Sequence, residues 1–157
     1  MSPFVNIHTH HYIDNKDLIQ IVNIDIDNLV NVDVSYFHSV GIHPWESLRS
    51  TDYSLQTLST LSQILSFSNS QFLKALGECG IDRVCDIDIE IQKDVFIKQI
   101  EIAERHHKPL IIHCVRAYPD IISIRKETKA TMPWIFHGFQ ANEQTAMQLL
   151  RHDGVYI

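Results

Sequence analysis

The sequence predicts an α/β protein in which parallel strands alternate with helices around a barrel. Short apolar runs recur along the chain, and several are separated by stretches with the spacing of an amphipathic helix. Parallel neighbours in a sheet need a crossover connection, which a helix usually supplies. The first strand is followed by THHYIDNK, which lacks the glycines of a phosphate-binding loop. A TIM-type (β/α) barrel is therefore favoured over an open doubly wound sheet.

Seven runs have the length and composition of strands. They cover residues 4–8, 18–24, 35–43, 72–78, 109–115, 133–139 and 154–157. The sequence stops inside the seventh run, whereas a complete barrel of this type has eight strands and roughly 200 residues or more. We therefore expect one domain, residues 1–157, that forms a shortened and incomplete barrel of about seven strands.

Two helices are predicted in the middle of the chain. The first lies in DYSLQTLSTLSQILSF, where Thr51 or Asp52 is placed to cap it. Its leucines at helical spacing are Leu55, Leu58, Leu61 and Leu65. The second covers residues 94–108 and ends in cationic side chains, which suit the negative end of the helix dipole.

Two more helices are predicted in the last third of the chain. One begins near Pro119, because proline is well tolerated in the first turn of a helix. The other runs from an Asn142 cap to Gly154, and both residues are typical of helix ends.

The composition is that of an ordinary globular domain, with 45% hydrophobic and 20% charged residues. No apolar run reaches the roughly 18 residues that span a bilayer, and no signal peptide is recognised, so we expect a cytoplasmic protein without a membrane partner. Three cysteines without a C-x-x-C pair argue against a disulfide framework or a thiolate zinc site. A net charge of -6 indicates that a polyanion would need local cations or bound metal.

The segment FVNIHTHHY places three histidines in an apolar run. Side chains alternate between the two faces of a strand, so His8 and His10 share one face and His11 lies on the other. An isolated H-x-H at a strand end is more often a pair of solvated histidines than a metal site. Only ligands from other strands would favour metal binding.

Polar side chains also end four later strands. They are His43 in GIHPW, Glu78 in ALGECGID, His113 in LIIHC and His137 in WIFHGF. A parallel barrel gathers these strand ends at one mouth, and ionisable groups are rarely placed in apolar strand ends without a partner. Imidazoles and a carboxylate together bind divalent metal ions, so the pattern predicts a metal site.

The predicted set exceeds what one ion with an open coordination position needs. Two ions about 3.5 to 4 Å apart would share a carboxylate, and Glu78, central in the strand order, is the expected bridge. Such a pair activates water and stabilises charge at a phosphoryl or carbonyl centre. We expect two divalent ions, Mg, Mn or Zn, and the sequence does not choose among them.

Two further side chains lie close to these strand ends. Arg116 follows His113 by three residues, and its planar guanidinium suits phosphate oxygens. A surface ion pair with Asp120 explains this arginine equally well. Trp45, just after GIHP, is expected to be a buried loop anchor, with stacking on a base as the alternative.

The motifs NIHTHHY, GIHPWE, LGECGID, IIHCVRA, FHGF and DGVYI follow one another in this order. In combination they resemble the TatD-like metal-dependent deoxyribonucleases over nearly the whole chain. The resemblance implies a TIM-type barrel with a dinuclear metal centre that hydrolyses phosphodiester bonds in DNA, often as an exonuclease. It implies that His8 and His10 hold one metal and that Glu78 bridges. His113 and His137 would hold the second metal.

The same resemblance places His43 and Arg116 near the substrate phosphate, where they act with Glu78 as catalytic residues. The first motif of the family usually reads Asp-x-His-x-His, and this chain has Asn6 at the position of the aspartate. The family also supplies a metal-binding aspartate from an eighth strand, which would lie beyond Ile157. We therefore expect either an incomplete first metal site or a substitute group, such as one from a neighbouring chain.

Two other functions fit parts of the pattern. An amidohydrolase acting on an amide or ester also begins with H-x-H, but it often bridges its metals with a modified lysine at the end of the fourth strand. That position is Glu78 here, and Lys74 lies four residues earlier, too deep to bridge. The other is a metal-binding but catalytically degenerate protein, because an incomplete barrel exposes sheet edges and invites self-association.

Overall fold

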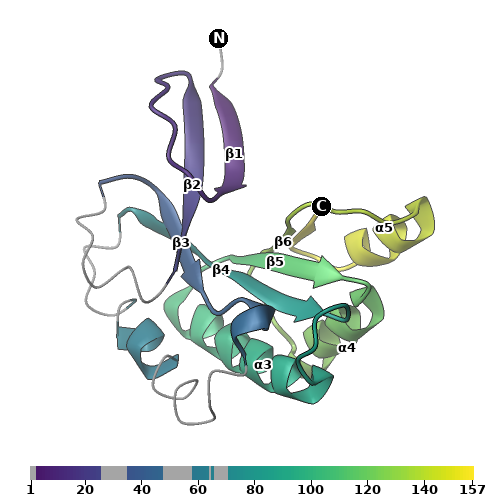
Figure 1. The fold of residues 1–157 in the computed structure, drawn as a ribbon. Coiled ribbons are helices and arrows are strands. Elements are labelled where there is room, and N and C mark those ends of the chain that lie inside the picture. The colour runs from purple at the N-terminus through teal and green to yellow at the C-terminus, as the bar shows by residue number, and fades with distance from the viewer. Residues whose placement is uncertain (1–2, 26–34, 48–57, 64, 66–70) are drawn as a thin grey trace.

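A single parallel sheet of seven strands forms the frame of the protein, and each strand pairs with the next along the chain. The computed structural model describes residues 3–25, 35–47, 58–63, 65 and 71–157. The strands are β1 (Phe4–Thr9), β2 (Leu18–Asp25), β3 (His38–Gly41), β4 (Leu73–Asp82), β5 (Leu110–Val115), β6 (Trp134–Phe136) and β7 (Val155–Tyr156). The sheet curls into part of a barrel (Figure 1), so the predicted α/β class and barrel-type fold are confirmed.

Helices cover the later strands of the sheet. They are α3 (Ile89–His106), α4 (Tyr118–Thr128) and α5 (Glu143–Leu150), and a short 3-10 turn, η1 (Pro44–Glu46), follows β3. Figure 1 shows α3 and α4 along β4 and β5, whereas β1 and β2 extend away from this helix-covered part. No helix in the described part of the chain is long and apolar enough to cross a membrane.

Strand β4 lies at the centre of the core. All of its residues except Lys74 are buried, because β3 and β5 flank it and α3 packs against it. From α3, the apolar residues Phe96 and Ile100 are fully buried, and Trp134 of β6 packs on Phe96 with ring centroids 5.5 Å apart. This core holds the ends of β4, β5 and β6 in fixed relative positions.

The predicted middle helix is described in part. Residues 58–63 are helical, and Leu58, Leu61 and Leu65 are buried in the same core. The predicted caps Thr51 and Asp52, and also Leu55, lie outside the described residues.

Several strand boundaries differ from the prediction, and the ends of β3 and β4 bear on the site. β3 ends at Gly41 rather than at residue 43, because Pro44 lacks an N–H for the sheet and opens η1. β4 continues four residues beyond Glu78 to Asp82, where its register still matches Val115 of β5. The longer β4 brings a second carboxylate to the same strand end as Glu78.

Helix boundaries follow local capping. α3 begins earlier than predicted, because the Asp88 side chain accepts the Glu90 N–H at 2.8 Å and caps the helix. The predicted Asn142 cap is confirmed, since its side chain accepts the Thr145 N–H at 2.9 Å.

Glu104 ties α3 to the loop before β6. Its carboxylate accepts the backbone N–H groups of Thr131 at 2.7 Å and Met132 at 2.8 Å, and the Thr131 hydroxyl at 2.6 Å. Burial opposes ionisation of Glu104, but these hydrogen bonds outweigh it, so the pKa of Glu104 is lowered.

We expect Glu104→Gln to lower the free energy of unfolding by about 1–2 kcal/mol at pH 7, because charge-assisted hydrogen bonds are lost. The pKa of Glu104 is lower in the folded protein than in the unfolded chain. The stabilisation is therefore fully present above the pKa of Glu104 in the unfolded chain, about 4.3, and it is lost as pH falls through the lower pKa of Glu104 in the folded protein. Urea unfolding from pH 7 to pH 3 measures the difference in the free energy of unfolding between Glu104→Gln and the wild type, and the exposed Glu101→Gln is the control. If the loss of stability in Glu104→Gln is as large at pH 3 as at pH 7, the ionised Glu104 carboxylate is not its source.

Candidate metal centre

The sequence-predicted residues gather at one end of the curled sheet. His8 comes from β1, Glu78 from β4 and His113 from β5, whereas His43 and His137 directly follow β3 and β6. A cleft of about 990 Å³ lies over this end. The predicted residues that line it are His10, His43, Glu78, His113, Arg116 and His137. His8 is buried, with 5% of its surface exposed.

Glu78 stands at the centre of the group and is almost fully buried. Its Oε2 lies 3.2 Å from His8 Nε2, and its Oε1 lies 2.7 Å from His113 Nδ1. Its backbone N–H donates to Asn23 Oδ1 at 2.8 Å, and the same amide oxygen accepts the Ser39 hydroxyl at 3.1 Å. Side chains from β2 and β3 therefore fix the backbone from which Glu78 projects.

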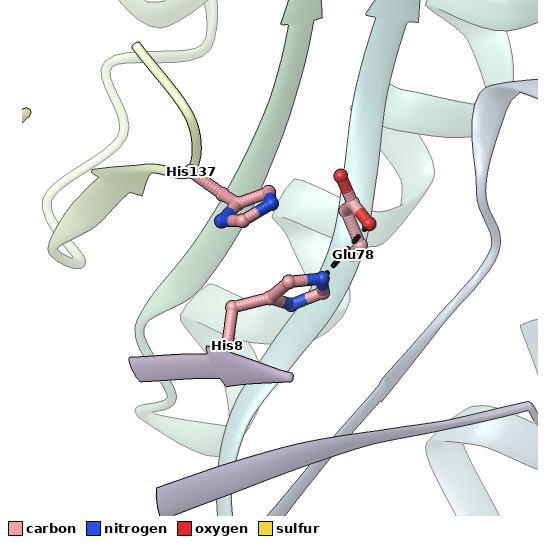
Figure 2. A group of neighbouring side chains, drawn as sticks. All are labelled: His8, Glu78 and His137. Carbon is pink, nitrogen blue, oxygen red and sulfur yellow. Dashed lines mark ion pairs between the residues drawn. The ribbon is translucent and has the colours of Figure 1, made fainter. Parts of the chain in front are cut away.

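One set of donor atoms consists of His8, Glu78 and His137, which lie within 4.8 Å of one another. Figure 2 shows the His8 and His137 rings facing each other beside the Glu78 carboxylate. Their ring centroids are 4.1 Å apart. His10 adjoins this set, because its Nε2 lies 3.3 Å from His8 Nε2.

A second set consists of His43, Glu78 and His113. His43 Nε2 lies 3.2 Å from His113 Nδ1, so two imidazole nitrogens and a carboxylate oxygen face one another. His43 is held at the start of η1, where its Nδ1 accepts the backbone N–H of Trp45 at 3.3 Å. Glu78 belongs to both sets and contributes a different oxygen to each.

This grouping differs from the pairing that the family resemblance implies. That pairing joins His113 with His137, whereas in the structure His137 lies against His8. His43, which was expected beside the substrate phosphate, brings a nitrogen to the same point as His113. The predicted histidines nevertheless gather around Glu78.

The charges of the site depend on burial and on the carboxylates. Burial and the neighbouring His113 lower the pKa of His43 to about 4, and burial together with His8 lowers the pKa of His137. Burial alone would lower the pKa of His113, but hydrogen bonds to Glu78 and Asp82 outweigh burial and raise this pKa above its ordinary value. At neutral pH His43 and His137 are thus uncharged rings.

Burial would raise the pKa of Glu78, but hydrogen bonds from His113 and His8 reverse the effect and lower it. Glu78 is therefore a carboxylate throughout the physiological pH range. It is the anionic element that a cation in this cluster would contact.

Sequence reasoning missed Asp82, which lies at the same strand end. Its Oδ2 lies 3.2 Å from His113 Nε2 and accepts the Trp45 indole N–H at 2.7 Å. Asp82 follows Glu78 by four residues on one strand, and this even spacing was a signal that both carboxylates share a face. Asn23 was missed as well, although an amide side chain in the mostly apolar run of β2 is also a signal.

Trp45 is not the buried anchor that was expected. It is 63% exposed and lines the cleft, while its indole N–H holds it to Asp82. The prediction of a buried side chain was wrong because one hydrogen bond at the edge of the indole ring holds Trp45 in place while the face of the ring stays exposed.

Arg116 lies on the rim of the cleft and is exposed. The alternative ion pair with Asp120 is not formed, since Asp120 pairs with Arg83 at 2.8 Å and Lys93 at 3.5 Å. Within the described ranges Arg116 has no ion-pair partner. Its charge therefore remains available to a ligand in the cleft.

Lys74 does not approach the site as a bridging lysine would. It is exposed near the start of β4, and its Nζ lies 4.5 Å from the centroid of the Phe37 ring. Glu78 occupies the position at which a modified lysine would have to stand. The structure thus gives no support to a lysine-bridged amidohydrolase.

A curled parallel sheet whose strand ends gather imidazoles around one glutamate defines the class of metal-dependent hydrolases. Residues 5–157 match the family model described as TatD related DNase. The chain belongs to this family.

Curated relatives agree with the class. The chain is 33% identical over 117 residues to an uncharacterised metal-dependent hydrolase of Buchnera aphidicola, covering 73% of this chain and 44% of the relative. It is 27% identical over 121 residues to a protein of Enterobacter lignolyticus named 3'-5' ssDNA/RNA exonuclease TatD, covering 76% and 44%. The matched part thus spans less than half the length of these relatives.

Solved structures agree on the fold. A TatD homologue of Escherichia coli superposes with a TM-score of 0.78 at 21% identity, covering 94% of this chain and 64% of the homologue. A TatD family hydrolase of Entamoeba histolytica gives a TM-score of 0.71 at 16% identity, covering 96% and 62%. These matches support the TIM-type fold expected from the sequence.

Proposed function

We propose that this chain is a phosphodiesterase acting on DNA, with two divalent metal ions held around Glu78. The observation that carries the proposal is the position of Glu78 in both donor sets, with one oxygen toward His8 and the other toward His113. A carboxylate shared in this way suits two neighbouring ions. The donors fit a metal, because in each of the two sets two imidazole nitrogens and a carboxylate oxygen of Glu78 lie within 4.8 Å of one another.

The nitrogen-rich donor set favours Zn over Mg, which prefers oxygen ligands. His8, His10, His113 and His137 would supply the nitrogen ligands around Glu78. Metal ions at this position lower the pKa of water and neutralise charge that develops on a phosphoryl group.

The remaining residues would bind and orient the phosphate. Arg116 presents a planar guanidinium on the rim of the cleft, where it can donate to two phosphate oxygens at once. His43 lines the same cleft and lies against His113, with a neutral ring at pH 7. The name of the Enterobacter relative supports nucleic acid as the substrate class.

A metal-dependence assay tests the proposal. The chain is freed of metal with a chelator and incubated with end-labelled single-stranded DNA, with Mn, Zn or Mg added separately. We expect DNA to be degraded only when a divalent ion is present. Comparison with RNA of the same sequence and with duplex DNA shows which nucleic acid is degraded. An amide or ester substrate tests the amidohydrolase alternative. Two bound ions with no turnover on any substrate would contradict the proposal and indicate a degenerate site.

Metal affinity is expected to depend on pH. Protons compete with metal ions for imidazole nitrogens, so Zn affinity should fall as pH drops from 8 to 5. His113, whose pKa is raised, takes up its proton first, and His43, with a pKa of about 4, takes it up late. Calorimetric titration with Zn between pH 5 and 8 measures the effect. Constant affinity over this range would be incompatible with imidazole ligands.

A further inference from the structure

We propose that Asp82 positions His113 for metal binding by accepting its Nε2–H, which leaves Nδ1 free to face Glu78 and His43. This inference rests on the proposed metal centre and adds a role for Asp82, the last residue of LGECGID, to which the family resemblance assigned none. In the contacts described above Asp82 does not touch Glu78, so it would act on the metal site through His113.

The two nitrogens of His113 face different partners. Nδ1 lies 2.7 Å from Glu78 Oε1 and 3.2 Å from His43 Nε2, at the centre of the second donor set. Nε2 lies 3.2 Å from Asp82 Oδ2. A neutral imidazole carries one proton, and a nitrogen that binds metal cannot carry it. When a cation stands beside Glu78, the proton must therefore be on Nε2, and Asp82 is the acceptor placed there.

Asp82 cannot easily turn away from His113. Its Oδ2 also accepts the Trp45 indole N–H at 2.7 Å, and its Oδ1 accepts the Val84 N–H at 2.8 Å. Gln92 holds the backbone of Asp82 on both sides, accepting its N–H at 2.8 Å and donating to its carbonyl at 3.0 Å. The side chain is only 4% exposed. Such a fixed acceptor can impose one ring orientation on His113.

These contacts also require a carboxylate rather than an amide. The described partners of the Asp82 carboxylate are Trp45, Val84 and His113, and with metal on His113 Nδ1 each of them would present an N–H group. In Asp82→Asn, an NH₂ group at the Oδ1 position would oppose the Val84 N–H. At the Oδ2 position it would oppose the Trp45 N–H and donate to His113 Nε2, which would move the ring proton to Nδ1. Either arrangement weakens the metal site without removing a ligand.

The experiment compares Zn binding and the His113 tautomer in the full chain. Long-range ¹H–¹⁵N spectra of the Zn-loaded protein report which ring nitrogen binds metal, and His113→Gln identifies the signals. We expect the wild type to show metal-bound Nδ1 and protonated Nε2. We expect Asp82→Asn to bind Zn about 10- to 100-fold more weakly and to lose this tautomer.

The matched control is Asp120→Asn. Asp120 is a partly buried carboxylate at the start of α4 that pairs with Arg83 and Lys93, so its removal should leave Zn affinity and the His113 signals unchanged. If Asp82→Asn does not fold, the wild-type spectrum still decides, because metal on Nε2 overturns the inference. Wild-type Zn affinity in Asp82→Asn, together with loss of binding in Glu78→Ala, would overturn the role of Asp82 alone. No Zn binding by the wild type would overturn the metal centre as well.

Discussion

Replacing Glu78 by glutamine is expected to remove both metal ions and to lower the rate of phosphodiester hydrolysis by at least about 10³-fold. The two side chains have the same shape, but the amide is neutral and has only one oxygen. Glu78 gives one oxygen to the set around His8 and the other to the set around His113, so both sets lose their anionic ligand at once. Metal analysis after dialysis and initial rates on labelled single-stranded DNA measure the two effects.

Glu90→Gln is the control for this change. Glu90 lies in the first turn of α3, and its side chain is 74% exposed. The same loss of one negative charge should therefore leave metal content and rate unchanged. If Glu78→Gln keeps one ion at wild-type affinity, Glu78 is not the shared ligand and the bridging geometry is wrong. If it keeps both ions and the rate, the proposed function fails.

The second large effect is expected from Gly80→Ala, which should lower the free energy of unfolding by about 3 kcal/mol or more. Gly80 lies between Glu78 and Asp82 and pairs in register with His113 of β5. Its φ is +145°, and an added Cβ would lie 2.1 Å from the His113 carbonyl oxygen. The clash is with backbone inside a buried sheet, so β4 and β5 must separate.

Because β4 and β5 carry Glu78, Asp82 and His113, the same separation should weaken Zn binding. Gly138→Ala is the control: its φ is +58°, and no atom lies within 4 Å of an added Cβ. Gly138→Ala should therefore lower the free energy of unfolding only by the cost of holding alanine in the left-handed backbone conformation, about 1–2 kcal/mol. Urea unfolding in the presence of a chelator separates stability from metal binding. Equal destabilisation by the two substitutions would show that β4 and β5 are not closely packed at Gly80.

Much of the fold could be predicted because its signals are local. Strand periodicity, the Asn142 cap and the apolar face with Phe96 and Ile100 are visible in short windows of sequence, and all have counterparts in the structure. The direction of parallel strands then implies that their carboxyl ends meet at one edge. This rule gathers His8, Glu78 and His113 without any knowledge of distances.

Other features could not be predicted because they depend on contacts between distant segments. The extension of β4 to Asp82 is stabilised by pairing with Val115 and by Gln92 of α3. The exposed position of Trp45 depends on a hydrogen bond that spans 37 residues of sequence. Neither follows from the local pattern, which favoured a shorter strand and a buried indole.

The sequence by itself determined the class of this protein: a parallel α/β barrel-type domain with histidines and one glutamate at the strand ends, because residue type and strand period are local properties. Only the tertiary structure decided which nitrogens face each other. Register shifts occur in β1 after Asn6 and in β4 after Leu76, and together with the curl of the sheet they set the position of each ring. As a result His137 lies against His8, His43 lies against His113, and Asp82 contacts the other ring nitrogen of His113. Such contacts between side chains of different strands form only when the sheet assembles, so no local pattern in the sequence specifies them.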